Sequence, residues 1–303
     1  MNFKMTPAKL MIALFTVVTL AIPVTTAVLP KQERSENENR SLADFPDIVN
    51  HNKMDKAENL GDVVGAIKWD YITVRDENSW MDDFENYFSD HLAGREEWVR
   101  VRNEIEMLAG KKEINGVYTL DDQLIQAFKE YDPDTVQKSI DAMNGFAANH
   151  PDMQVSLMLA PTAQELFSSE IPAYAGYLSE KSFIDECYKK MSGISTVDCL
   201  SFLSGHKNDY VFYRTDHHWT SLGAYYAYCA AAKTLGYSSY GLDSFNIETP
   251  SSSFRGTLYS KTLDNSITPD SIDYYMLASG EPKVKMTVFD GRNETAYDSM
   301  YVR

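Results

Sequence analysis

The sequence predicts an α/β fold in which the strands of a sheet are joined by right-handed crossovers. Segments with strand and helix patterns alternate between residues 115 and 235. Residues 154–160 form a short, mostly apolar run before Pro161, as a buried parallel strand does. Of the 303 residues, 44% are hydrophobic, which is enough to build the core of one large domain or slightly more.

The N-terminal segment, residues 1–29, predicts export. Lys4 and Lys9 precede an apolar run over residues 10–29, which is interrupted by Pro23. Thr25 and Ala27 offer a small-x-small cleavage site, whereas the length of the run approaches the roughly 20 residues that span a bilayer. A cleaved signal peptide and a retained membrane anchor both stay open. We expect the rest of the chain outside the cytoplasmic membrane, either anchored or secreted.

Residues 30–69 predict a polar stalk that is rich in Glu and Asn, so regular structure is expected to begin near Asp70 and the folded domain to cover residues 70–303. The formal net charge of −16 has the wrong sign for attraction to nucleic acid. Cys187, Cys199 and Cys229 are an odd number without C-x-x-C spacing, which favours small core residues over a disulfide framework, although one pair could form.

Residues 77–111 predict one long amphipathic helix or two consecutive helices. Apolar side chains recur at steps of three and four, with an interruption at Gly94. A stripe that faces the core is the favoured interpretation, and an aromatic platform for a ligand is the alternative. The stripe consists of Trp80, Phe84, Tyr87, Phe88, Leu92, Trp98, Val101, Ile105 and Leu108.

Further elements follow in order along the chain. A strand is expected over residues 115–119 after a turn at Asn115-Gly116, and a helix over 133–149 with Asp132 as its cap. Helices are expected over 178–191 and 220–235, with a short strand over 211–213 between them. Beyond Gly241, residues 254–260, 272–278 and 284–290 predict strands and hairpins.

The densest group of reactive side chains is Asp216-His217-His218-Trp219, between the strand at 211–213 and the helix that starts at Thr220. In an extended segment, Asp216 and His218 point to one side and His217 to the other. Asp216 can then accept a hydrogen bond from Nδ1 of His218, leaving Nε2 free as a general base. The N-terminus of the following helix favours a neutral imidazole.

Two other interpretations of this segment remain. The residues could form a turn that only caps the helix, or they could bind a metal ion. His150 and His206 stand alone and no familiar metal-ligand spacing is present, so a base dyad is favoured and no metal or cofactor is predicted.

Four motifs resemble one family. They are NENRSLADFP at 37–46, DFENYFSDHLAGREEW at 83–98, LMLAPTA at 157–163 and TDHHWT at 215–220. They resemble the DHHW family of exported Gram-positive proteins and, more distantly, the SGNH-like domains that O-acetylate alginate. The resemblance implies an SGNH- or flavodoxin-like three-layer α/β/α sheet.

The resemblance also implies a function. It implies an acyl esterase or O-acetyltransferase that acts on a cell-surface polysaccharide through a Ser-His-Asp mechanism, with a membrane-bound O-acyltransferase as a possible partner. Asp216 would orient His218, the catalytic base, and Trp219 would be a neighbouring structural or substrate-contacting residue. His217 is a further candidate for contact with substrate.

The sequence departs from the family pattern at the nucleophile. Relatives carry an Asp-Ser-aromatic turn after the Asp-x-His-Trp motif, and the nearest substitutes in this chain are Ser260 and Ser299. We therefore expect a shortened domain with an incomplete C-terminal sheet and no turnover through a serine ester. A non-catalytic glycan-binding or scaffolding module is the alternative function, and a metal-dependent hydrolase is a third.

Overall fold

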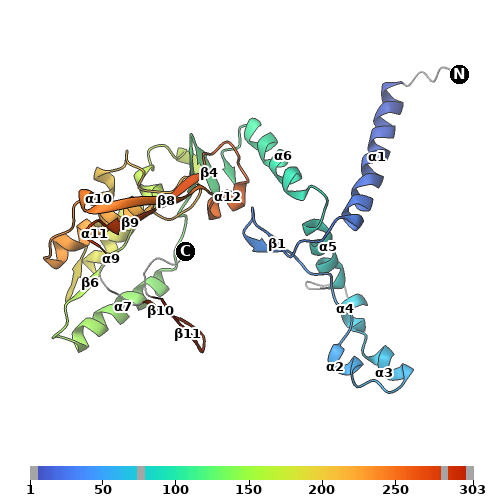
Figure 1. The fold of residues 1–303 in the computed structure, drawn as a ribbon, viewed down its shortest axis with the longest axis horizontal. Helices are drawn as coiled ribbons and strands as arrows, with labels where there is room; N and C mark the ends of the chain where they lie inside the picture. Colours follow the sequence, from blue (N-terminus) through green and yellow to red (C-terminus); the bar gives the residue numbers. More distant parts are fainter. Residues whose placement is uncertain (1–5, 74–78, 281–285, 298–303) are drawn as a thin grey trace. The chain divides into compact units, whose positions relative to one another are not determined.

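The computed structural model describes residues 6–73, 79–280 and 286–297 (Figure 1). The chain divides into two compact units, residues 1–111 and 112–303. The α/β class predicted from the sequence is confirmed. The predicted domain boundaries remain a prediction.

The first unit is mostly helical. It contains a hairpin of β1 (Arg34–Ser35) and β2 (Arg40–Ser41) within the predicted stalk. The Arg40 guanidinium donates to both carboxylate oxygens of Asp90, at 2.9 and 2.5 Å, and Ser35 donates to Glu96 at 2.6 Å. The expectation that regular structure begins near Asp70 is therefore wrong, because these polar side chains fasten the hairpin to the helices that follow. The helices are α1 (Pro7–Val28), α2 (His51–Met54), α3 (Leu60–Gly65), α4 (Trp69–Thr73), α5 (Trp80–Asp90) and α6 (Arg95–Leu108).

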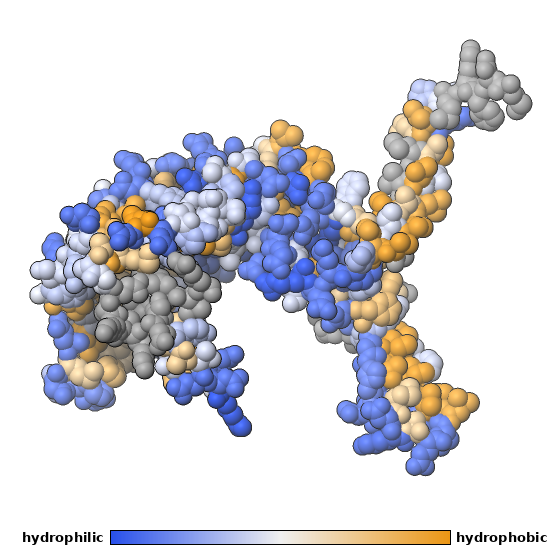
Figure 2. All heavy atoms as spheres, in the orientation of Figure 1, coloured by the Kyte–Doolittle hydropathy of each residue, from blue (hydrophilic) through white to orange (hydrophobic). Residues whose placement is uncertain are grey.

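Helix α1 is mostly apolar, and orange side chains run along it in Figure 2. Within the described part of the chain, Pro7–Thr26 is the one helical stretch long and apolar enough to cross a membrane. Its end is held inside the first unit, because Thr26 is buried and its hydroxyl accepts a hydrogen bond from the Ala93 amide at 3.0 Å.

Helices α5 and α6 confirm the predicted break at Gly94, which adopts φ 69°. The predicted burial of their apolar stripe holds only in part. On α5, Phe84 and Tyr87 pack against Phe45 from the preceding segment, with ring centroids 6.2 and 5.2 Å from the Phe45 ring. On α6 the core-facing prediction is wrong, because the apolar side chains are exposed. Periodicity defines a face but not what covers it.

The second unit begins with an antiparallel sheet of β3 (Glu113–Ile114), β4 (Val117–Leu120) and β5 (Gln123–Gln126). Asn115 and Gly116 form the predicted turn, both with positive φ. Helix α7 (Pro133–Asn149) matches its prediction, with Asp132 as N-cap.

A parallel pair follows, with β6 (Val155–Leu157) alongside β7 (Ile194–Thr196). Their connection contains α8 (Ala163–Leu166), η1 (Ala173–Ala175) and α9 (Glu180–Lys189). The predicted strand at 154–160 and helix at 178–191 are both present in shorter form, but the strand that pairs with β6 is β7, which was not predicted. Among the described strands, parallel pairing is confined to β6 and β7.

The remainder combines helices and antiparallel strands. Helix α11 starts where predicted, with Thr220 as its N-cap, whereas residues 254–260 are not a strand, because β8 ends at Phe254 and a short helix follows. Residues 284 and 285 of the last predicted strand lie outside the described residues. The elements are α10 (Cys199–Gly205), α11 (Ser221–Leu235), η2 (Leu242–Ser244), β8 (Phe245–Phe254), α12 (Thr257–Thr262), β9 (Asp270–Leu277), β10 (Met286–Asp290) and β11 (Asn293–Tyr297).

The core of the second unit gathers buried side chains from several elements. It joins β4, β5, α8, α10 and α11 to the segment that precedes the Asp-His-His-Trp motif. Cys187 and Cys199 are buried, Cys229 is half-buried, and all three are free thiols. The buried cluster consists of Tyr118, Ile125, Ala163, Leu166, Ile171, Ala175, Cys199, Leu203, Val211, Phe212 and Ala227.

Candidate functional site

The Asp-His-His-Trp motif lies in a tight loop clamped between the core and α11. Phe212 and Trp219 form an isolated antiparallel bridge, and the Thr220 amide donates to the Val211 carbonyl at 2.9 Å. A Cβ at Gly223 would lie 2.2 Å from that carbonyl oxygen, so only glycine fits there. The predicted strand at 211–213 is reduced to this bridge, and the loop bends rather than extends.

Asp216 and His218 form the pair that the sequence predicts. Nδ1 of His218 lies 2.6 Å from Oδ1 of Asp216, and the same oxygen accepts the His218 amide at 2.9 Å. The Asp216 side chain is 5% exposed and that of His218 is 66% exposed. Because an ionised carboxylate only accepts, Nδ1 carries the proton, and Nε2 is left as the acceptor.

The second oxygen of Asp216 is held by a residue that the sequence did not reveal. Thr257, the first residue of α12, donates to Oδ2 through its amide at 2.8 Å and its hydroxyl at 3.0 Å. Gly256 allows this approach, since a Cβ there would lie 2.4 Å from the Asp216 side chain. Burial raises the pKa of Asp216, but the hydrogen bonds from Thr257 and His218 outweigh it and hold the pKa below its ordinary value.

A second buried carboxylate, Asp270, fixes the backbone just before Asp216. Asp270 is fully buried and accepts the amides of Arg214 and Thr215 at 2.7 and 2.8 Å, together with the Thr215 hydroxyl. Thr215 in turn accepts the Gly256 amide at 2.9 Å, which ties the motif to the start of α12. Thr257 and Asp270 lie 41 and 54 residues beyond Asp216, and nothing in their local sequence marks them.

His217 does not point away from the pair, so that prediction is wrong. The bend in the loop brings the His217 and His218 rings to 3.9 Å between centroids. Nδ1 of His217 lies 2.8 Å from the Thr257 hydroxyl. Because the single Thr257 hydroxyl proton is donated to Asp216, His217 donates to Thr257 and its Nε2 is an acceptor.

Trp219 is half-buried and packs against the core cluster. Through this contact Trp219 has a structural role at the start of α11. The predicted contacts of Trp219 and His217 with substrate remain predictions.

The metal interpretation is less well supported by this geometry. Ligand atoms of Asp216, His217 and His218 lie within 4.8 Å of one another. However, an ionised carboxylate has about four acceptor positions, and those of Asp216 receive hydrogen bonds from the amide and ring of His218 and the amide and hydroxyl of Thr257. A metal ion would have to displace these donors, so the donor set fits an orienting carboxylate better than a metal ligand.

The two substitute serines do not complete a triad within the described residues. Ser260 lies in α12, and its hydroxyl faces the Gly256 carbonyl at 3.3 Å. Ser299 lies outside the described residues. In the part of the chain that the structure describes, no serine hydroxyl forms a hydrogen bond with the His218 ring.

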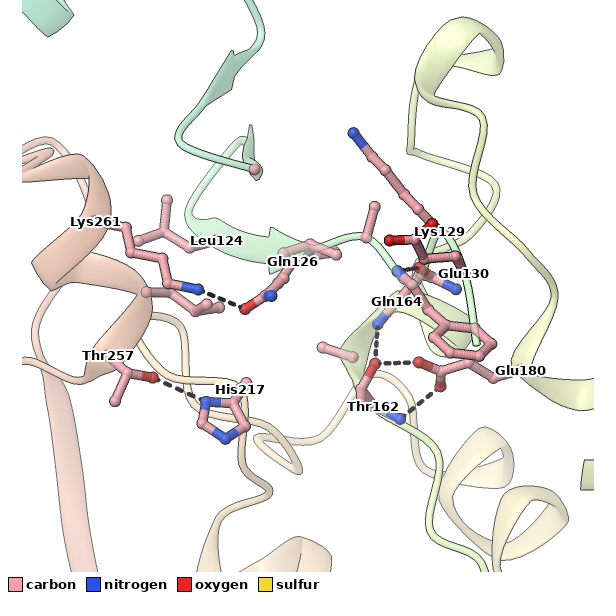
Figure 3. Close-up of a pocket in the computed structure, with 16 residues that line it drawn as sticks. Leu124, Gln126, Lys129, Glu130, Thr162, Gln164, Glu180, His217, Thr257 and Lys261 are labelled. Atoms are coloured by element: carbon pink, nitrogen blue, oxygen red, sulfur yellow. Dashed lines mark hydrogen bonds between the residues drawn. The ribbon is translucent and has the colours of Figure 1, made fainter. Parts of the chain in front are cut away.

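A pocket of about 690 Å³ opens beside the motif, within the second unit. His217 and Thr257 lie on one side, and Thr162 and Glu180 on the other (Figure 3). Glu180 accepts the amide and hydroxyl of Thr162 at 2.7 and 2.6 Å, and burial raises the pKa of Glu180. Such a mixture of apolar lining and converging polar groups is typical of small-molecule sites.

Comparison with known proteins gives a family match. Residues 154–294 match the model described as DHHW protein. A DHHW family protein from Eubacterium siraeum is 29% identical, with a TM-score of 0.48 over 55% of this chain and 56% of that chain. None of the curated proteins compared matches the chain.

Other solved structures are more distant. PatB1 from Bacillus cereus, solved with a sulfonyl adduct, is 15% identical, with a TM-score of 0.51 over 63% of this chain and 65% of that chain. The O-acetyltransferase domain of Pseudomonas putida AlgJ is 16% identical, with a TM-score of 0.39 over 53% of this chain and 64% of that domain. The chain thus spans between 56% and 65% of these solved relatives. The DHHW resemblance predicted from the sequence is confirmed for residues 154–294.

Proposed function

We propose that this protein is exported and anchored to the membrane, and that it uses Asp216 and His218 to add or remove O-linked acyl groups on a cell-surface polysaccharide. The observation that carries the proposal is the 2.6 Å contact between a buried carboxylate and an exposed imidazole. His218 is the general base, and Asp216 is the positioning residue that fixes its tautomer.

The chemistry follows from this arrangement. Nε2 of His218 accepts a proton from an attacking hydroxyl as its oxygen bonds to the carbonyl carbon of an acyl ester. When the tetrahedral intermediate collapses, the bond to the leaving oxygen breaks and the same nitrogen returns the proton to it. In the Ser-His-Asp mechanism that the resemblance implies, the attacking hydroxyl is that of a serine. No serine hydroxyl among the described residues forms a hydrogen bond with the His218 ring, so the proposal requires Ser299, which lies outside those residues, as the nucleophile. Measured turnover would overturn the expectation that this chain lacks activity through a serine ester.

The pocket beside His217 is the proposed acceptor site. Its lining combines polar side chains from Gln126 and Lys261 with apolar contact from Ala127 and Phe128, which suit a sugar ring with its hydroxyls. A membrane-bound O-acyltransferase is the proposed donor partner. Retention of α1 would tether the chain to the same membrane as such a partner.

Two features support retention of α1. Its span of Pro7–Thr26 is long enough to cross a bilayer. The predicted cleavage site lies within the helix, which continues to Val28, and Thr26 is buried against Ala93. Proteases prefer exposed, irregular segments, so this junction is a poor substrate.

The test is turnover of a chromogenic acetyl ester by the purified full chain. We expect His218→Ala to lower the rate by about a thousandfold or more, the scale on which triad members act. The matched control is His206→Ala, because His206 also pairs with an aspartate, Asp209, at 2.9 Å. Equal rates for wild type and His218→Ala would refute the dyad as the catalytic base.

A sulfonyl fluoride reagent then identifies the attacking residue. Activated hydroxyls form stable sulfonyl adducts, so peptide mapping after labelling locates the nucleophile. We expect labelling that depends on His218, and labelling that is unchanged in His218→Ala would contradict activation by that residue.

A non-catalytic glycan-binding module is the second candidate. It is favoured by the lack of a hydrogen bond from any described serine hydroxyl to His218. Glycan-array binding that survives both Asp216→Ala and His218→Ala, together with no ester turnover, would select this module over the enzyme.

A further inference from the structure

Helix α6 presents its apolar stripe outward. Trp98, Val101, Ile105 and Leu108 have exposed fractions of 53%, 46%, 61% and 88%. Their spacing of three, four and three residues is the repeat of a coiled-coil seam. Figure 2 shows this apolar surface over the C-terminal part of α6.

The exposed half of α6 coincides with the half that a coiled coil would bury. With Trp98 and Ile105 at a positions and Val101 and Leu108 at d positions, the flanking e and g positions are occupied by Glu97, Arg102 and Glu104, which are also exposed. The remaining positions from 99 to 107 are half-buried or buried, and Asn103, directly opposite the seam, is buried. The less exposed side of the helix therefore lies opposite the seam, and the seam itself is exposed.

We infer that α6 pairs with α6 of a second copy of this chain in a parallel, two-stranded coiled coil. The charges beside the seam select this occupant and orientation. In a parallel pair, Glu97 at g lies beside Arg102 at e of the partner helix, five residues further along. The two opposite charges attract each other. An antiparallel pair would place g beside g and e beside e. Glutamate would then lie next to glutamate and arginine next to arginine, and these like charges would repel each other. Ile105 at a with Leu108 at d is also the combination that favours two strands.

Because α6 is short, attachment to a membrane would help two copies to pair. The helix has 14 residues, or two heptads, which is marginal for an isolated pair. Anchoring by α1 holds both copies in one orientation and raises their effective concentration. The inference rests on the proposed membrane anchoring in this respect only and is independent of the chemistry of Asp216 and His218.

The first experiment uses the full chain in lipid vesicles and a cysteine substitution at the seam. We expect Ile105→Cys to form a disulfide-linked dimer upon mild oxidation, because equivalent a positions face each other in a parallel pair. Leu60→Cys is the control, since Leu60 is exposed on α3 of the same unit. No cross-link at 105, or an equal cross-link at 60, would overturn the inference.

The second experiment tests the charges. We expect Glu97→Arg and Arg102→Glu each to lower the dimer fraction by about five- to tenfold, because two symmetric pairs become repulsive. The double variant restores both pairs and should recover the dimer. Failure of the double variant to recover it would exclude the parallel register.

Ester turnover measured on the same vesicles keeps the two proposals separate. Turnover without a dimer refutes the coiled coil and leaves the proposed function intact. A dimer without turnover refutes the proposed function and leaves the coiled coil intact.

Discussion

Two hydrogen-bonded pairs of histidine and aspartate in the described part of the second unit differ in the environment of the carboxylate. His218 and Asp216 are 2.6 Å apart, and His206 and Asp209 are 2.9 Å apart. The Asp216 side chain is 5% exposed, whereas that of Asp209 is 45% exposed. The comparison teaches that two pairs with similar contact distances can differ in the burial and in the hydrogen-bond donors of the carboxylate.

The environments of the imidazoles differ too. His206 stacks on Tyr226 with 3.6 Å between ring centroids, and Asp209 accepts the Tyr226 hydroxyl at 3.1 Å. The His206 bond, followed by the Tyr226 bond, holds the pKa of Asp209 below its ordinary value. This pair joins its loop to α11, whereas Nε2 of the exposed His218 ring forms no hydrogen bond with any described residue.

The largest expected effect comes from neutralising each aspartate. Asp216→Asn should lower ester turnover by about 10⁴-fold, because the amide no longer holds the productive tautomer of His218. Asp209→Asn should leave turnover unchanged. Circular dichroism verifies that both variants are folded, and a similar loss of turnover in the two would erase the distinction between the pairs.

Packing beside Asp216 gives the next largest effect. Gly256→Ala places a Cβ 2.4 Å from the Asp216 side chain, so we expect it to lower the free energy of unfolding by about 1–3 kcal/mol. The control is Gly145→Ala within α7, where a Cβ would meet nothing within 4 Å and helix propensity improves. Urea unfolding measures both, and equal stability of Gly256→Ala and wild type would show that the close approach is not required.

Removing the Thr257 hydroxyl should have a smaller effect. Thr257→Val deletes the bond to Asp216 and the bond from His217, so the free energy of unfolding should fall by about 1 kcal/mol. Turnover should fall by about tenfold, and Thr257→Ser should restore both. Loss of function in the serine variant would point instead to the methyl group.

The smallest effect concerns acid stability. Since the pKa of Asp216 is lower in the folded protein than its ordinary 3.8, its stabilisation is present above that value and is lost as the pH falls through the folded pKa. Thermal unfolding midpoints of wild type should therefore approach those of Asp216→Asn as the pH falls from about 5 to about 2. A constant difference between the two over this range would show that Asp216 titrates normally.

Local signals predicted local structure well. The cap and proline that start α7, the turn at Asn115-Gly116 and the break at Gly94 each follow from one or two residues. Helix α12 was missed because it has six residues and its first amides bond to Asp216 and Thr215, far away in the sequence. The pairing of Asp216 with His218 was predictable from their separation of two residues. The contributions of Thr257 and Asp270 depend on tertiary contacts that no pattern in one sequence encodes.

The hydrogen bonds from Thr257 to Asp216 also determine when the site can form. Half of the donors that hold the carboxylate come from 41 residues further along the chain, across a loop that contains α11 and β8. Closing that loop costs conformational entropy before any contact repays it. In a chain that emerges from its N-terminus first, the histidine and aspartate remain an ordinary surface turn until the residues beyond position 257 have emerged and folded, so the site matures late.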